Sequence, residues 1–224
     1  MSINKQIVFT AILLISSVLF FGITEVDLLV QDYFYNYDTH KWILDWALQP
    51  YRFIFYDGGK KALILVGISF LVVLVFFRKT KLVKEYKKGI LLVVLSAILV
   101  PGVTGLIKNN TNMPCPKHEI RYGGTYPRTA VWESYPADFK QAKTKCWPAG
   151  HASGGFALLS IFFLFKRRKN RLIALGVSFS IAWSMGLYKM IIGDHFLSHT
   201  LITMFLAWLI ILILEKIINF KSNL

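Results

Sequence analysis

The chain has 224 residues, of which 55% are hydrophobic and 17% are charged, and its formal net charge is +14. This composition excludes a disordered chain, a collagen and an ordinary soluble domain. A charge of this size raises the question of nucleic-acid binding. The basic residues, however, stand in short clusters between apolar runs, and membrane topology explains that pattern better. We therefore expect a membrane protein that does not bind nucleic acid.

Six apolar runs are long enough, or nearly so, to cross a bilayer, which takes about 20 residues. They cover residues 7–23, 62–77, 89–107, 149–165, 172–192 and 197–220. The second and fourth are short, which a tilted or thinned bilayer tolerates. The first run follows Lys5 without a small-residue cleavage site, so we expect an uncleaved anchor. The pattern predicts one all-α domain over residues 1–224, a bundle of six transmembrane helices.

Charge fixes the expected orientation of these helices. Six lysines and arginines lie in residues 78–88 and five more in 166–171, whereas half of the acidic residues lie in 25–57. Cationic loops stay in the cytoplasm. Both termini are then cytoplasmic, and the loop 109–148 and the turn 193–196 face outside. The external segment 40–56 is rich in aromatic residues, which suit either a membrane-interface belt or the lip of an active site.

Reactive polar residues stand at the outer ends of the later runs. Lys108 ends the third run, His151 opens the fourth, Lys189 ends the fifth, and His195 and His199 open the sixth. Ionisable groups at membrane depth are costly and therefore mark functional sites. By the predicted topology, all of them face the same side of the membrane.

Each of these residues also has a structural interpretation. The lysines can extend to the membrane interface, and His151 can cap a helix or bind a backbone carbonyl. His195 and His199 are four residues apart, the spacing of a two-histidine metal site, but such a site needs further ligands. Asp194 is expected to point away from that face. We expect no metal and no cofactor.

Together these residues suit phosphoryl transfer. Two lysines supply positive charge for an anion, and the start of the fourth helix offers N–H groups, with Gly150 allowing close approach. Two histidines on different helices can serve as nucleophile and acid. A histidine nucleophile divides the reaction into two steps through a phosphoenzyme.

At three motifs the chain resembles the type 2 phosphatidic acid phosphatase superfamily of membrane lipid phosphatases. The family motifs are Lys-x6-Arg-Pro, Pro-Ser-Gly-His and Ser-Arg-x5-His-x3-Asp. The chain has Lys108-x6-Cys115-Pro116, then Pro148-Ala149-Gly150-His151, then Tyr188-Lys189-x5-His195-x3-His199. Order and spacing agree, and the resemblance covers the six-helix plan, while the identity of the motif residues is partial.

The resemblance implies a role for each matching position. His195 is the expected nucleophile, which forms a phosphohistidine, and His151 is the acid that protonates the leaving oxygen. Lys108 and Lys189 are expected to bind phosphate oxygens. The backbone N–H groups of Ala149 and Gly150 are expected to add donors.

Two arginines of the family pattern are absent. Cys115 stands at one position, so one bidentate phosphate clamp is lost, and Lys189 stands at the other, which keeps the charge without the planar fork. Arg121 and Arg128, in the external loop, are the candidates to replace the missing clamp.

Two further departures concern a serine and an aspartate. Ala149 removes a hydroxyl but keeps the backbone donors. His199 stands where the family has the aspartate that orients the nucleophile. A neutral imidazole can accept the ring N–H of the nucleophile, although it stabilises an imidazolium less than a carboxylate does. Because both key histidines and the spacing are intact, we expect a divergent active branch rather than an impaired enzyme.

The chain contains two cysteines, Cys115 and Cys146, both in the expected external loop. Thiols outside the cytoplasm are commonly oxidised. The family plan brings the first two motifs together, so we expect a disulfide rather than two free thiols. The loop 109–148 is long for a connection without structure, and it is interpreted either as a lid that selects the lipid headgroup or as a solvated surface loop.

The resulting hypothesis is a bacterial inner-membrane phosphatase whose active site faces the periplasm or exterior. Its expected partners are the bilayer and a lipid phosphate or pyrophosphate. Lipid A phosphate or undecaprenyl pyrophosphate is favoured over phosphatidylglycerophosphate or phosphatidate, because of the outward-facing site, the cationic loop and family analogy. A lipid phosphotransferase with the same histidine chemistry, or a non-catalytic lipid-phosphate binder or transporter, are the alternatives. The sequence indicates no oligomeric state.

Overall fold

The structure is a computed structural model that describes residues 1–136 and 138–220. Its α-helices are α1 (Ile3–Ile23), α2 (Val26–Asp32), α3 (Gly58–Phe76), α4 (Lys81–Asn110), α5 (Gly150–Ala157), α6 (Arg168–Ile191) and α7 (Leu197–Phe220). A π-helical turn, η1 (Phe53–Asp57), leads into α3, and a 3-10 segment, η4 (Leu158–Phe163), continues α5. Strands β1 (Tyr35–Asn36) and β2 (Lys41–Trp42) form a small antiparallel hairpin.

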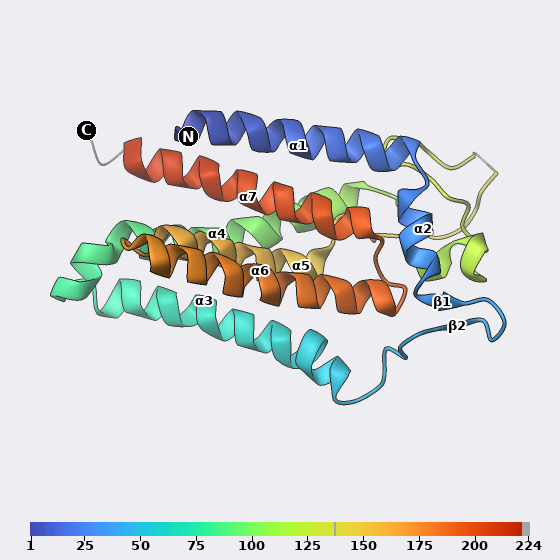
Figure 1. The fold of residues 1–224 in the computed structure, drawn as a ribbon, viewed down its shortest axis with the longest axis horizontal. Helices are drawn as coiled ribbons and strands as arrows, with labels where there is room; N and C mark the ends of the chain where they lie inside the picture. Colours follow the sequence, from blue (N-terminus) through green and yellow to red (C-terminus); the bar gives the residue numbers. More distant parts are fainter. Residues whose placement is uncertain (137, 221–224) are drawn as a thin grey trace.

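The helices lie side by side, and they alternate in direction when α5 and η4 are counted as one segment between α4 and α6, so that α1 begins and α7 ends at the same end of the bundle (Figure 1). In the described residues, five helical segments are long and apolar enough to cross a membrane. The prediction of an all-α membrane bundle is confirmed. The fourth predicted run forms only the shorter apolar helix Gly150–Phe163, so the count of six spans stays a prediction.

The short helix α5 occupies the centre of the bundle, where it packs against α4, α6 and α7. Small residues bring its neighbours close: a methyl group on Gly155 would lie 2.8 Å from the Cα atom of Ala182 on α6. Phe156 and Ala157 are buried in the same core. By contrast, no residue of α3 is buried, and this helix contacts the bundle mainly through α4.

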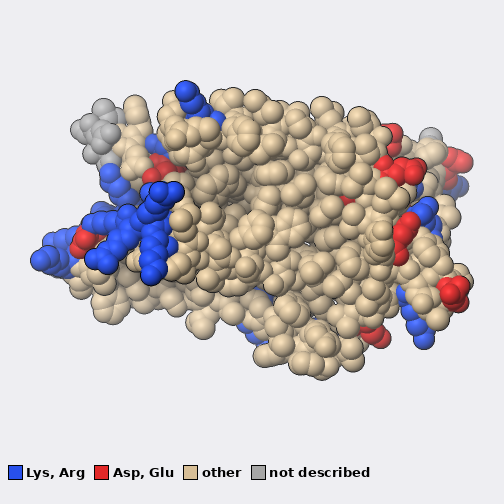
Figure 2. Space-filling view, viewed as in Figure 1, with Lys and Arg blue, Asp and Glu red and all other residues tan. Residues whose placement is uncertain are grey.

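Figure 2 shows a dense cluster of lysines and arginines at one end of the bundle, whereas acidic and basic residues are mixed at the other end. The basic end carries the α3–α4 and η4–α6 connections, which are joined by an ion pair of 2.6 Å between Lys166 and Glu85. Such clusters mark the cytoplasmic side of a membrane protein. The opposite end carries the candidate site.

The segment between α1 and η1 folds over this opposite end. In α2, Asp27 accepts the backbone N–H and the hydroxyl of Ser198 at the start of α7, at 2.8 and 2.5 Å. Gln31 donates its side-chain N–H to the Met190 carbonyl at 2.8 Å. The loop after α4 contains two short 3-10 turns, η2 (Pro116–His118) and η3 (Ile120–Tyr122). The two contacts from α2 therefore hold the α6–α7 turn both at the end of α6 and at the start of α7.

Candidate active site

The α6–α7 turn presents His195 because of the backbone at Gly193. Gly193 has a φ of +74°, a conformation that favours glycine, and a side chain there would lie 2.3 Å from the Trp42 ring. The Gly193 carbonyl accepts the N–H of Lys117, and the N–H of Asp194 returns to the Lys189 carbonyl at 2.8 Å. The turn is thus fixed by α6, by β2 and by the external loop.

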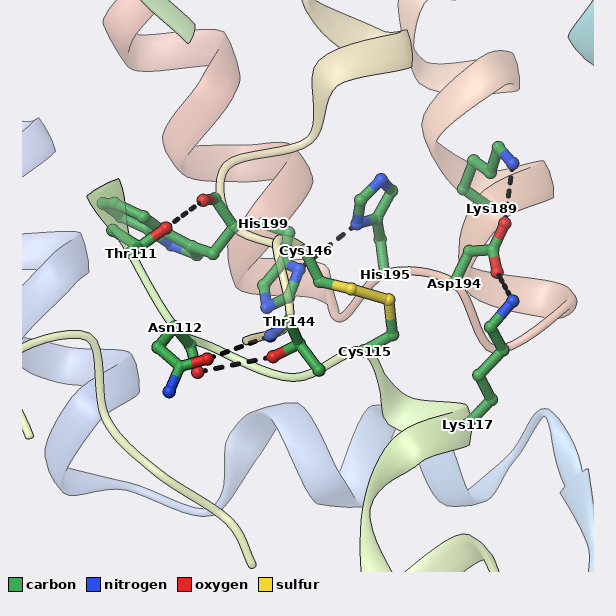
Figure 3. The surroundings of a disulfide bond; sticks show 11 residues. Thr111, Asn112, Cys115, Lys117, Thr144, Cys146, Lys189, Asp194, His195 and His199 are labelled. Atoms are coloured by element: carbon green, nitrogen blue, oxygen red, sulfur yellow. Dashed lines mark hydrogen bonds and ion pairs between the residues drawn. A yellow bond between two sulfur atoms is a disulfide. The ribbon is translucent and has the colours of Figure 1, made fainter. Parts of the chain in front are cut away.

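His195 and His199 form a buried pair, 4% and 0% exposed. Their Nδ1 atoms lie 3.3 Å apart, so one ring donates and the other accepts (Figure 3). Which ring donates depends on the tautomers; when His199 accepts, His195 carries its proton on Nδ1 and its Nε2 has a free lone pair. Burial, the charge of His199 and the neighbouring lysines hold the pKa of His195 well below its usual range. A neutral imidazole is the form that acts as a nucleophile.

Asp194 lies between two lysines rather than away from the site. Its carboxylate binds Nζ of Lys189 at 2.6 Å and Nζ of Lys117 at 2.7 Å (Figure 3). Although burial alone would raise it, these two lysines hold the pKa of Asp194 below its usual value. Asp194 therefore stays ionised and joins the end of α6 to the external loop.

The second motif forms the start of α5. The backbone N–H of Ala149 donates to the Thr203 hydroxyl at 2.8 Å and to the His199 carbonyl at 3.3 Å. That donor is therefore engaged with α7 and is not available to a phosphate in this structure. Gly150, the next residue, faces Lys108: a methyl group on Gly150 would lie 3.7 Å from Nζ of Lys108.

A cavity of about 520 Å³ lies between α3, α4 and α5. Lys60, Lys108, Gly150 and His151 line its polar part. The rest of its wall is apolar, with residues such as Leu63, Ile68, Val94, Ala97 and Leu158. The cavity therefore has room for an amphiphile, with charge at one part and an apolar lining elsewhere.

The two candidate arginines lie outside this cavity. Arg121 forms a two-pronged ion pair with Asp32 of α2, at 2.9 and 2.5 Å. Arg128 donates to the Thr24 carbonyl at 3.3 Å and places its guanidinium 5.7 Å from the centre of the Phe196 ring. Neither arginine is among the residues that line the cavity with Lys108 and His151, so their role in binding phosphate stays a prediction.

Cys115 and Cys146 are joined in a disulfide, with 5.2 Å between their Cα atoms. Figure 3 shows this bridge next to the histidine pair. Within the described residues, the three side chains close enough to share a metal ion are Cys115, His118 and Cys146, and the disulfide uses both thiols. His195 and His199 are not part of that group.

Sequence reasoning missed the aromatic residue at the centre of the site. The Tyr56 ring stacks on the His151 ring with 4.4 Å between centroids, and Nζ of Lys189 lies 4.0 Å from the Tyr56 centroid. Tyr56 thereby links the second and third motifs. The aromatic content of segment 40–56 was a signal for it, but that content does not single out one ring. Lys117 and Thr203 were missed because nothing in their local sequence marks them.

The comparisons agree with this geometry. The model of the PAP2 superfamily matches residues 89–222, which include Lys108, His151, Lys189, His195 and His199. No curated protein and no solved structure gives a significant match to the chain. Five long apolar helices, the histidine pair and the family match over more than half of the chain lead to one conclusion: this multi-pass membrane protein belongs to the PAP2 superfamily, whose members are phosphatases acting on phosphate esters.

Proposed function

We propose that the chain is a lipid phosphatase that works at the extracytoplasmic face of a bacterial inner membrane through a phosphohistidine. The observation that carries this proposal is that Lys108 and His151, one residue from each of the first two motifs, line a largely apolar cavity of about 520 Å³. A lipid phosphate has the matching shape, with an anionic head and an apolar tail. A water-soluble phosphate ester would leave the apolar wall unused.

In the first step, Nε2 of His195 attacks phosphorus and His151 gives a proton to the leaving oxygen. Lys108 and Lys189 balance the negative charge that the transition state spreads over the three equatorial phosphate oxygens. In this step His199 accepts the Nδ1–H of His195, so that Nε2 of His195 has its lone pair free; the two Nδ1 atoms lie 3.3 Å apart. In the second step, His151 takes a proton from water, and that water releases phosphate from His195.

The substrate is proposed to be a lipid A phosphate or undecaprenyl pyrophosphate. Family analogy and the outward-facing site support this choice. Residues 1–224 are proposed to act as one domain, with loop 109–148 as a lid over the headgroup. The disulfide and the ion pair between Lys117 and Asp194 hold this loop beside the third motif, which supports the lid.

The test measures phosphate released from a panel of purified lipid phosphates in detergent with excess chelator. We expect wild-type turnover without a divalent ion, because lysines meet the phosphate charge. His195→Ala should lose several orders of magnitude, since only unassisted water attack remains. The control is His40→Asn, which changes an exposed histidine whose positive φ asparagine tolerates.

Four outcomes would count against the proposal. Appreciable activity of His195→Ala would remove the nucleophile. Loss of activity in chelator, restored by one divalent ion, would indicate a metal mechanism. Transfer of phosphate to a second lipid in place of release would identify a phosphotransferase, and lipid binding without turnover would identify a binder or transporter.

A further inference from the structure

The ring of Tyr56 lies beside His151, the acid of the proposed reaction. Tyr56 belongs to a segment that precedes the family match. Tyr56 is in η1, the π-helical turn before α3, whereas the match begins at residue 89. Irregular turns of this kind are frequent at functional sites. The turn is docked on α6, because the neighbouring Phe55 ring stacks on Tyr188 with 5.6 Å between centroids. Tyr188 in turn donates to the Trp46 carbonyl at 3.1 Å.

The contacts of the Tyr56 ring are directed at two functional side chains. It stacks on His151 at 4.4 Å with 27° between the ring planes, and the Lys189 ammonium lies 4.0 Å from its centre. An aromatic face attracts a cation at this distance. The Lys189 ammonium is thus held between the Tyr56 ring and the Asp194 carboxylate, at 2.6 Å from the latter.

His151 has little else to fix the plane of its ring. Within the described residues, no hydrogen bond to the His151 imidazole is found, in contrast to His195, which is bound by His199. The torsion that turns a histidine ring is broad, so an unsupported ring samples many orientations. A general acid needs its nitrogen within about 3 Å of the oxygen it protonates.

We propose that Tyr56 is a positioning residue that holds the His151 ring in the orientation for protonating the leaving oxygen. This rests on the proposed function, in which His151 is that acid. The ring face carries out this role, and the Tyr56 hydroxyl is not required. The proton that leaves His151 goes to the bridging oxygen as its bond to phosphorus breaks, and Tyr56 takes no part in the transfer itself.

If Tyr56 positions the acid, replacing it should slow the reaction only for substrates whose leaving oxygen needs a proton. An alkoxide leaves only with a proton, whereas p-nitrophenolate leaves without one. The experiment measures phosphoenzyme formation in a single turnover with a lipid A phosphate, which has an alkoxide leaving group, and with p-nitrophenyl phosphate. Tyr56→Leu should slow the reaction of the lipid phosphate about 10- to 100-fold, as a misplaced general acid does, and that of p-nitrophenyl phosphate less than about twofold. Tyr56→Phe should restore both rates.

Phe55→Leu is the matched control, since Phe55 lies on the same turn but stacks on Tyr188. Any loss in this variant should be equal for the two substrates. An equal loss for both substrates in Tyr56→Leu, or no loss in either, overturns the positioning role. His151→Ala separates the two proposals: its own loss must also be selective for the lipid phosphate. An unselective His151→Ala would overturn the acid role in the proposed function, whatever Tyr56→Leu does.

Discussion

Replacing Glu119 with glutamine should make the protein more resistant to heat at alkaline pH. Glu119 joins η2 and η3 and is only 2% exposed. One of its carboxylate oxygens is buried and has no hydrogen-bond partner among the described residues. Burial raises the pKa of Glu119 to about 7, although the positive charge of Arg128 opposes the shift. The folded protein therefore holds this proton well above the pH at which an unfolded chain releases it.

The consequence is a loss of stability as the pH rises. Between the ordinary value of 4.5 and about 7, the unfolded state releases the proton and the folded state keeps it, so the free energy of unfolding falls. At about 1.4 kcal/mol per pH unit, this interval amounts to roughly 3 kcal/mol. For a chain of this size, that corresponds to a melting temperature lower by roughly 6–12 °C at pH 8 than at pH 4.5.

Glutamine keeps the shape of Glu119 and has no proton to lose. We expect Glu119→Gln to match the wild type near pH 4.5 and to melt higher above pH 7, as measured by scanning fluorimetry in detergent. Burial also raises the pKa of Asp27, to about 6, so a smaller slope should remain in both proteins. Glu133→Gln, at an exposed carboxylate, is the control and should follow the wild type. Parallel curves for Glu119→Gln and wild type would refute the reasoning.

Three further results are expected. His199→Asp should retain more activity than His199→Ala, because a carboxylate can accept the His195 N–H and adds favourable charge; equal rates near wild type would exclude the orienting role. Without reductant, thiol labelling should modify neither Cys115 nor Cys146, whereas labelling of both would contradict the disulfide. Gly193→Ala should destabilise the protein by about 3 kcal/mol, through its positive φ and the clash with Trp42, and a chemical denaturation curve unchanged from wild type would contradict this.

The helices could be predicted because membrane spans depend on local composition. A run of about 20 apolar residues has few alternatives to a helix in a bilayer. The extent of the fourth helix was less accessible, because its length follows from packing among α4, α6 and α7. His151 and His195 could be placed at the same end of the bundle, because each lies at the outer end of a predicted membrane span. That position can be read from the sequence alone.

Contacts between distant segments could not be predicted in the same way. Arg121 was a candidate for phosphate binding, but Asp32 lies 89 positions earlier and takes both prongs of its guanidinium. The stacking of Tyr56 on His151 likewise joins two segments with no shared local pattern. The engagement of the Ala149 N–H by Thr203 depends on how α5 meets α7. Each of these contacts depends on the packing of the whole chain.

The α6–α7 turn receives much of its support from residues that precede the matched region. Gln31 binds the Met190 carbonyl, Trp42 covers Gly193, and Asp27 caps the first turn of α7. A chimera that carried residues 89–222 behind an unrelated pair of leading helices would keep every motif residue, yet it would lose these three braces. Transferring the motif residues alone would therefore not transfer the contacts that hold the α6–α7 turn. Libraries that diversify the site should include residues 26–57, where a substitution changes the catalytic geometry without touching any motif.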